Sequence, residues 1–236
     1  MFAIRRKIRR AFELIRLDIS AALERDPAAR SAAEVIFCYP GFHAVLLHRA
    51  AHFMWERRRH LIARAMSHLT RFLTGIEIHP GARIGEGFFI DHGMGVVIGE
   101  TSEIGRNCTI YHGVTLGGVN LAKGKRHPTL MDGVMVGVGA KIMGPHTLGA
   151  GSRVGAGSVV IGDVPPGSTV VGVPARIVYR DGEGRLEEPM ALAFEHHKLP
   201  DPVEAALQSL NQRITELERA LDFAREAGGR PRREGP

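Results

Sequence analysis

The middle of the chain repeats an aliphatic residue every six positions, and this period constrains the fold more than any other feature. A hexapeptide repeat with one inward-pointing aliphatic residue is typical of a parallel β-helix, in which three hexapeptides make one triangular coil. Glycine often follows the aliphatic residue, where turns need backbone freedom. The in-phase positions are Ile78, Ile84, Ile90, Ile98, Ile104, Ile110, Leu116, Val136, Ile142, Leu148, Val154 and Val160.

Two interruptions of this period are candidate functional loops. The step from Ile90 to Ile98 contains two extra residues, and the step from Leu116 to Val136 is twenty residues long. We therefore expect a loop extruded over residues 117–133. Loops on a rigid repeat scaffold are common places for binding and catalytic residues.

The regions on either side of the repeat have helical patterns, so the expected fold class is α+β. Apolar spacing over residues 1–74 predicts an α-helical N-terminal domain that ends before Gly75. We expect the β-helix over residues 75–178, and a linker, one helix and a disordered tail over residues 179–236. That last helix has a heptad pattern, which suits either packing on its own subunit or a trimeric coiled coil. Its apolar residues are Val203, Leu207, Leu210, Ile214, Leu217, Leu221 and Ala224.

Composition argues against several classes of protein. No run approaches the roughly 18 apolar residues of a membrane span, and the N-terminus lacks the apolar core of a secretory signal. Cys38 and Cys108 give neither a disulfide framework nor a metal-ligand spacing. Much of the net charge of +6 lies in basic clusters at the two ends, without interleaved aromatic residues that stack bases. We expect a cytoplasmic protein with no metal and no nucleic-acid or membrane partner.

Five histidines lie in the repeat region. Two of them, His92 and His127, fall in the irregular segments beside a charged residue, Asp91 and Arg126 respectively. An imidazole can accept a hydroxyl proton near neutral pH, and a carboxylate can orient it. These segments therefore contain the residue types that general base catalysis requires. The other three are His79 and His146, whose neighbouring prolines favour a structural role, and His112, which stays undecided.

Longer motifs between residues 26 and 176 resemble those of the serine O-acetyltransferases, which belong to the left-handed hexapeptide acyltransferases. The resemblance implies a left-handed β-helix and acetyl transfer from acetyl-CoA to L-serine, the first step of cysteine biosynthesis. It covers about two thirds of the chain. The matching motifs are Gly41-Phe42-His43-Ala44, Ile78-His79-Pro80, Asp91-His92, Gly99-Glu100-Thr101, Val114-Thr115-Leu116-Gly117-Gly118, Lys125-Arg126-His127-Pro128 and Gly172-Val173-Pro174-Ala175-Arg176.

The resemblance implies a catalytic role for three residues. His92 matches the family's general base for the serine hydroxyl. Glu77 stands where many members have the aspartate paired with that histidine, so its longer side chain must reach the same ring nitrogen by another rotamer. His127 matches a second histidine that helps to hold the substrate and stabilise the oxyanion. The implied mechanism is direct transfer in a ternary complex.

The resemblance also implies binding roles. Asp91 matches a carboxylate that binds the substrate ammonium, and Asp26 matches another, brought in from the helical domain. Arg126 matches the group that binds the substrate carboxylate. Acetyl-CoA is expected in a groove between neighbouring subunits. Its implied contacts are Gly117 and Gly118 on a strand edge, Arg176, and Lys123 or Lys125 for the phosphates.

The implied partners are L-serine, acetyl-CoA and L-cysteine, the last as a feedback inhibitor. Longer members carry extra N-terminal helices that join two trimers, so this chain fits a homotrimer as well as a dimer of trimers. Many members end in a tail with a terminal isoleucine that inserts into O-acetylserine sulfhydrylase. This chain ends Arg233-Glu234-Gly235-Pro236, which departs from that pattern.

Three alternative functions share parts of this pattern. An acetyltransferase for a sugar, antibiotic or other hydroxyl would have the same fold, although Asp26, Asp91 and Arg126 suit an amino acid better. A zinc-dependent carbonic anhydrase would need a close histidine pair, and the repeat histidines are at least 13 residues apart. A non-enzymatic scaffold would leave unexplained why acid, base and arginine gather in two irregular segments.

Overall fold

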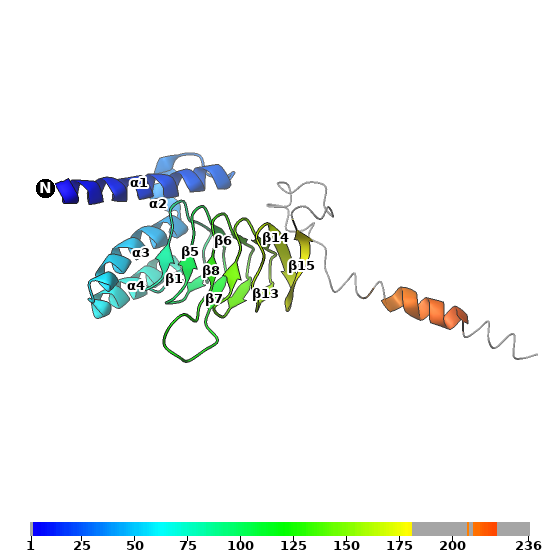
Figure 1. Ribbon diagram of the computed structural model, residues 1–236. Coiled ribbons are helices and arrows are strands. Elements are labelled where there is room, and N and C mark those ends of the chain that lie inside the picture. The colour runs from blue at the N-terminus through cyan, green and yellow to red at the C-terminus, as the bar shows by residue number, and fades with distance from the viewer. Residues whose placement is uncertain (1, 181–206, 208–209, 221–236) are drawn as a thin grey trace, which may run out of the picture. The chain divides into compact units, whose positions relative to one another are not determined.

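The computed structural model describes residues 2–180, 207 and 210–220, and it divides into one unit over residues 1–199 and another over residues 200–236. In the first unit four helices precede a stack of short strands (Figure 1). The helices are α1 (Phe2–Arg25), α2 (Ala32–Cys38), α3 (Pro40–Glu56) and α4 (His60–Thr74). α4 ends where the sequence predicted, with Gly75 in the left-handed conformation at φ 72°.

The strands form three sheets, one on each face of a triangular coil, and every pairing is parallel except that of the last two strands. Sheet A contains β1 (Glu77–Ile78), β4 (Val97–Ile98), β7 (Thr115–Gly117), β10 (Lys141–Met143) and β13 (Val159–Val160). Sheet B contains β2 (Arg83–Ile84), β5 (Glu103–Ile104), β8 (Thr129–Leu130) and β11 (Thr147–Leu148). Sheet C contains β3 (Phe89–Asp91), β6 (Thr109–Tyr111), β9 (Met135–Val136), β12 (Arg153–Val154), β14 (Ser168–Gly172) and β15 (Ala175–Arg180). The expected parallel β-helix is confirmed.

The predicted inner residues stack from coil to coil. In sheet A, Ile78 pairs with Ile98, which pairs in turn with Leu116. The predicted aliphatic residues are buried, apart from Ile84, which is partly exposed and packs against the core. Burial of such a side chain contributes roughly 1.5–3 kcal/mol, so the repeated residue is the main source of cohesion between coils.

Both interruptions are accommodated without a change of register. Paired residues are 18 apart in a regular coil, as in Lys141 and Val159. They are 20 apart across the first interruption, where Glu77 pairs with Val97, and 26 apart across the second, where Thr115 pairs with Lys141. Each interruption therefore adds residues only at a corner.

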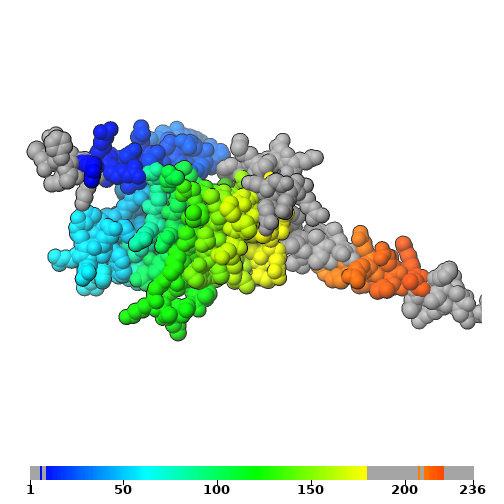
Figure 2. Space-filling model, in the orientation of Figure 1, coloured from blue at the N-terminus to red at the C-terminus, as the bar shows by residue number. Residues whose placement is uncertain are grey.

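The second loop is shorter than expected. The sequence predicted an extruded segment over residues 117–133, but β8 begins at Thr129, and Leu130 pairs with Ile104 as a buried member of the repeat. Leu130 lies six residues before Val136 and so belongs to the later run of the repeat. The prediction overran because it began that run one hexapeptide too late, at Val136. Figure 2 shows the loop protruding from the molecular surface, in green.

The helical region packs on the β-helix closely enough to position the segment after β3. A Cβ added to Gly41, at the start of α3, would lie 2.1 Å from the carbonyl oxygen of Ile90. Only glycine permits this approach. Asp18 of α1 accepts hydrogen bonds from the guanidinium of Arg49 on α3 at 2.8 Å and from the N–H of Gly87 at 3.0 Å. α1, α3 and the first coil are thus tied together.

In the second unit, Leu207 and residues 210–220 are helical, which agrees with the predicted C-terminal helix. The predicted linker from 181 onward and the tail from 221 onward lie outside the described residues. In the part of the chain that the structure describes, no helix is both long and apolar enough to span a bilayer.

Candidate active site

Two corners of the triangular coil carry the predicted site residues. We name the turn that leads from sheet C into sheet A, residues 91–96 in the first coil, the C–A corner. The turn that leads from sheet A into sheet B, residues 99–102 in the next coil, is the A–B corner. Because β4 (Val97–Ile98) separates these two segments, they lie at opposite ends of that strand.

Asp91 and His92 form the C–A corner. His92 has a left-handed backbone with φ 57°, and Gly93 and Gly95 follow with φ 86° and 75°. The His92 side chain is 75% exposed, and its Nε2 lies 3.8 Å from Oδ1 of Asp91, whose side chain is 22% exposed. A non-glycine residue in this conformation is uncommon, although Arg58 and Asn107 adopt it too, and strained backbone tends to cluster at functional sites.

A second carboxylate reaches this corner from the helical region. Asp26 follows α1, and its Oδ2 accepts a hydrogen bond from the hydroxyl of Tyr39 at 2.6 Å. Burial raises the pKa of Asp91. Among the charged groups around this carboxylate, His92 lowers the pKa and Asp26 raises it. Burial, together with the hydrogen bond to Asp26, also raises the pKa of Tyr39. Two nearby carboxylates with little compensating positive charge suit an ammonium group.

His112, undecided from the sequence, belongs to the same corner. Its ring lies edge-on to that of His92, with 5.7 Å between centroids and an interplanar angle of 83°. Its Nδ1 is buried and has no hydrogen-bond partner among the described residues. Next to it, burial raises the pKa of Tyr111, as do the charges of Asp91 and Asp26. The base candidate is therefore surrounded by aromatic and acidic groups.

Thr101 holds Arg126 and His127 at the A–B corner, where the protruding loop rejoins the β-helix. Its Oγ1 accepts hydrogen bonds from the backbone N–H groups of Arg126, at 3.0 Å, and of His127, at 3.1 Å. Its own N–H donates to Nδ1 of His127 at 3.2 Å, and Oγ1 lies 3.0 Å from the same nitrogen. One threonine therefore anchors both residues.

These contacts determine which nitrogen of the His127 ring carries the proton. Because Nδ1 accepts from a backbone N–H, the proton of the neutral ring is on Nε2. Burial lowers the pKa of His127, and the charge of Arg126 lowers it further, so the neutral form is favoured. The ring occupies the space above Gly99, where an added Cβ would lie 2.0 Å from Cδ2. His127 is thus a fixed donor, as an oxyanion requires.

Arg126 is oriented by Glu100. Its Nη2 donates a short hydrogen bond to Oε2 of Glu100, and this bond is the main reason that the pKa of Glu100 is lowered. Its Nη1 lies 3.4 Å from the carbonyl oxygen of Gly124. A guanidinium has five N–H donors, so capacity remains for a second carboxylate.

Glu77 is not the carboxylate that the structure places beside His92. It forms an ion pair with Arg71 of α4, with 3.0 Å between Nη1 and Oε2, and its side chain is 35% exposed. Among the described residues, His92 forms its ion pair with the carboxylate of Asp91. The pairing of Glu77 with His92 stays a prediction from the resemblance.

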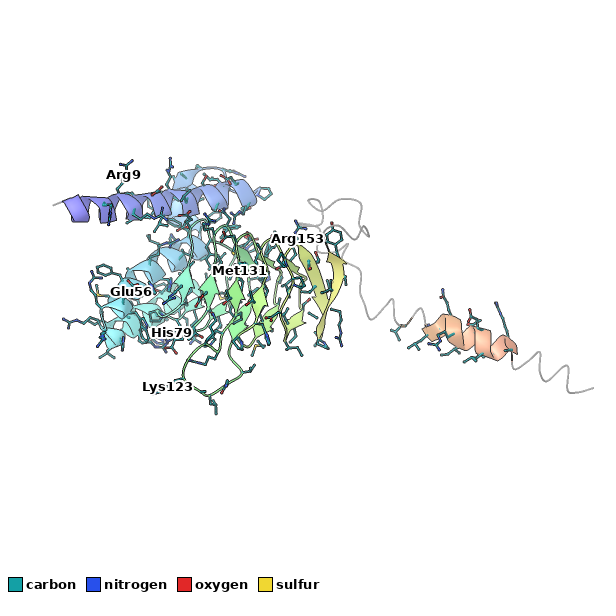
Figure 3. The ribbon with its side chains drawn as sticks, in the orientation of Figure 1. Arg9, Glu56, His79, Lys123, Met131 and Arg153 are labelled. Atoms are coloured by element: carbon teal, nitrogen blue, oxygen red, sulfur yellow. The ribbon has the colours of Figure 1, made fainter. Side chains whose placement is uncertain are left out.

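The predicted acetyl-CoA contacts lie on two stretches of the β-helix. Gly117 ends β7, and an added Cβ there would lie 2.7 Å from Sδ of Met143; one on Gly118 would lie 3.2 Å from Nε2 of His127. Lys123 lies on the protruding loop (Figure 3). Arg176 lies on β15, beside a hollow of about 310 Å³. The two glycines lie next to the A–B corner, and so does Lys125, whose Nζ donates a hydrogen bond to the carbonyl oxygen of Thr101 at 2.9 Å.

Sequence reasoning assigned no role to Thr101 or Tyr39, each of which holds a predicted site residue. Thr101 lies within the Gly99-Glu100-Thr101 motif, and Tyr39 lies two residues before the motif that begins at Gly41. A hydroxyl within or just before a motif was therefore the available signal. What could not be seen was its partner, because Thr101 and His127 are 26 residues apart and meet only when two coils stack.

A model of the N-terminal region of serine acetyltransferases matches residues 3–46. The serine acetyltransferase of Bacillus subtilis is 51% identical over 215 residues, covering 91% of this chain and 97% of the relative.

Solved structures are also similar. The serine acetyltransferase of Neisseria gonorrhoeae in complex with serine is 42% identical, with a TM-score of 0.70, over 72% of this chain and 69% of that one. The serine acetyltransferase of Brucella abortus in complex with coenzyme A has the same identity and TM-score, over 72% of this chain and 68% of that one.

Proposed function

The chain belongs to the serine acetyltransferase family, whose reaction moves an acetyl group from acetyl-CoA to the hydroxyl of L-serine, and we propose that His92 is the general base of that reaction here. The observation that carries the proposal is the C–A corner, where an exposed histidine in a strained turn adjoins two carboxylates. A serine hydroxyl is a poor nucleophile at neutral pH, so the reaction needs such a base.

The substrate contacts follow from charge. Asp26 and Asp91 bind the ammonium of serine, which supplies the positive charge that this corner lacks. Arg126 binds the carboxylate of serine through donors that Glu100 leaves free. L-cysteine carries the same two charged groups, so it competes with serine for these residues.

The transfer then proceeds in one complex. His92 takes the proton of the serine hydroxyl, and the oxygen attacks the carbonyl carbon of the thioester. Nε2–H of His127 donates to the oxyanion of the tetrahedral intermediate. The C–S bond breaks, and the departing thiolate takes the proton from His92. No cysteine nucleophile is needed, and Cys108 is a poor candidate because burial raises its pKa to about 11.

A cyclic trimer brings the two corners together. Within one chain they lie at opposite ends of β4, and a threefold axis would set the C–A corner of one copy against the A–B corner of the next. α4 offers an apolar surface for such a contact, because monomers rarely expose large contiguous apolar patches. Its exposed residues are Leu61, Ile62, Leu69, Phe72 and Leu73.

Two further parts of the proposal concern coenzyme A and location. Lys125 forms an ion pair with Glu103 at 3.6 Å beside a hollow of about 330 Å³, which places a cation near the loop for phosphate binding. Arg176 and Lys123 would make the outer contacts. The free thiols of Cys38 and Cys108 suit a reducing compartment such as the cytoplasm. Pairing with a sulfhydrylase rests on the family alone.

The test is thiol release from acetyl-CoA, measured with and without L-serine for the wild type and for His92→Asn. Asparagine tolerates the left-handed backbone of this position, so the variant keeps the turn and removes the base. We expect serine-dependent release that falls by about 10²-fold or more in the variant. An unchanged rate in the variant would mean that another residue is the base. Thiol release with a sugar in place of serine would mean that the acceptor is a sugar hydroxyl.

A further inference from the structure

The C-terminal helix presents an apolar stripe that no other described residue of its own unit covers. Over residues 210–220 its apolar side chains are 52% to 69% exposed, and Leu207, one turn earlier, is 55% exposed. The other positions of residues 210–220 are polar or alanine, and all of them are exposed. The exposed large apolar residues are Leu207, Leu210, Ile214 and Leu217. An amphipathic helix of this length is marginal alone, so its stability depends on a partner for this stripe.

The stripe has the register of a coiled coil. Leu210 and Leu217 occupy d positions, and Leu207 and Ile214 occupy a positions, with steps of three and four residues. The sequence continues the pattern on both sides, with Val203 before it and Leu221 and Ala224 after it. The outward b, c and f positions are polar: Gln212, Thr215, Glu216 and Arg219.

The charges that flank the stripe favour parallel helices. Arg213 occupies a g position and Glu218 the following e position, five residues later. Within one helix residues five apart do not face each other, because neighbours on a helix are three or four apart. In a parallel coiled coil a g residue faces the next e residue of the adjacent helix, so Arg213 of one chain would meet Glu218 of another.

We propose that the C-terminal helices of three copies of this chain associate as a parallel coiled coil. The proposal rests on the trimer described under the proposed function. Cyclic symmetry directs all three C-termini to the same side of the assembly, so their helices can run only in parallel, as the charge pattern requires. The coiled coil adds a second contact between subunits that the β-helix already holds together, which raises the effective concentration of the subunits for one another.

The first test is disulfide cross-linking of full-length chains that carry Cys38→Ser. Leu217→Cys places a thiol at a d position, where neighbouring helices approach closely. Gln212→Cys places one at an outward f position of the same helix, and both sites are exposed in the single chain. Mild oxidation should link pairs of Leu217→Cys chains at least several-fold more than Gln212→Cys chains. Equal cross-linking of the two variants, or no cross-linking of Leu217→Cys chains, would overturn the proposal. No cross-linking is the result expected if the helix packs on its own subunit.

The second test reverses the charges and follows the mass of the assembly on dilution by sedimentation velocity. Arg213→Glu should make the trimer dissociate at higher protein concentration, and Arg213→Glu combined with Glu218→Arg should restore it. Acetyl transfer to serine is measured on the same samples. Normal transfer with no cross-linking would refute only the coiled coil. A monomer without transfer would refute the proposed function as well.

Discussion

The two corners of the β-helix hold their histidines in opposite ways. His92 stands in a strained turn with its side chain 75% exposed, and its recorded ion-pair partner is 3.8 Å away. His127 is buried, and Thr101 binds both its ring and its backbone. The C–A corner has an excess of negative charge, whereas the A–B corner has its acid, Glu100, already paired with Arg126.

This difference matches two chemical roles. A general base exchanges protons during each turnover, so it must reach substrate and accept a charge. An oxyanion donor acts best when it is oriented before the reaction, because no energy is then spent on reorganisation. In the proposed mechanism the exposed His92 is the general base and the buried His127 is the oxyanion donor, which agrees with this difference in how they are held.

The largest expected effect tests whether the corners work across subunits. His92→Asn and His127→Gln chains should each lose about 10²-fold or more of the activity when assayed alone. If they are co-assembled in equal amounts, about a quarter of the sites would combine two intact corners, because each corner is intact in half of the chains. The measurement is serine-dependent thiol release from the mixed trimers. A mixture as inactive as its components would mean that each chain uses its own two corners.

A smaller effect concerns the anchor of the A–B corner. Thr101→Val removes the hydroxyl that accepts from Arg126 and His127, so we expect kcat to fall on the order of 10-fold through misplacement of both side chains. Ser102→Ala is the matched control, because the neighbouring Ser102 hydroxyl is buried and has no hydrogen-bond partner among the residues that the structure describes. Steady-state kinetics that show equal losses in both variants would point to general destabilisation of the coil.

The smallest effect is on acid stability. The pKa of His127 is lowered in the folded chain, so below its ordinary value of about 6.5 the unfolded chain binds a proton that the folded chain does not. The free energy of unfolding should therefore fall as the pH drops from about 7 to 5. In His127→Gln this decline should be smaller, by less than about 1 kcal/mol. Denaturant unfolding at both pH values measures this difference. If the free energy of unfolding declines equally in the wild type and in His127→Gln, burial does not suppress protonation of His127.

The β-helix could be predicted from the sequence because one residue in six carries its core. Leu130 was missed although it lies six residues before Val136, because the 14-residue step from Leu116 hid the start of the later run, and only its pairing with Ile104 shows that it belongs to the core. A periodic signal locates repeated contacts but cannot measure the length of an insertion.

For the site, the sequence could predict which residues take part but not how they are arranged. Motif matches identified His92 and His127, but they could not show that the two lie at opposite ends of β4. They also could not show that Glu77 turns to Arg71, because the choice of partner depends on α4, which packs beside β1. Such contacts are set by tertiary packing between segments that are far apart in the sequence.

The constant register across the protruding loop has a practical consequence. Since Thr115 and Lys141 pair normally on either side of it, the length of the loop is independent of the stacking of the coils. Leu121, fully exposed in this loop, is therefore a position where a fluorescent or spin label can be attached without disturbing the fold. If acetyl-CoA binds along Gly117 and Gly118 as proposed, the signal of a label on this neighbouring loop should change when the cofactor binds.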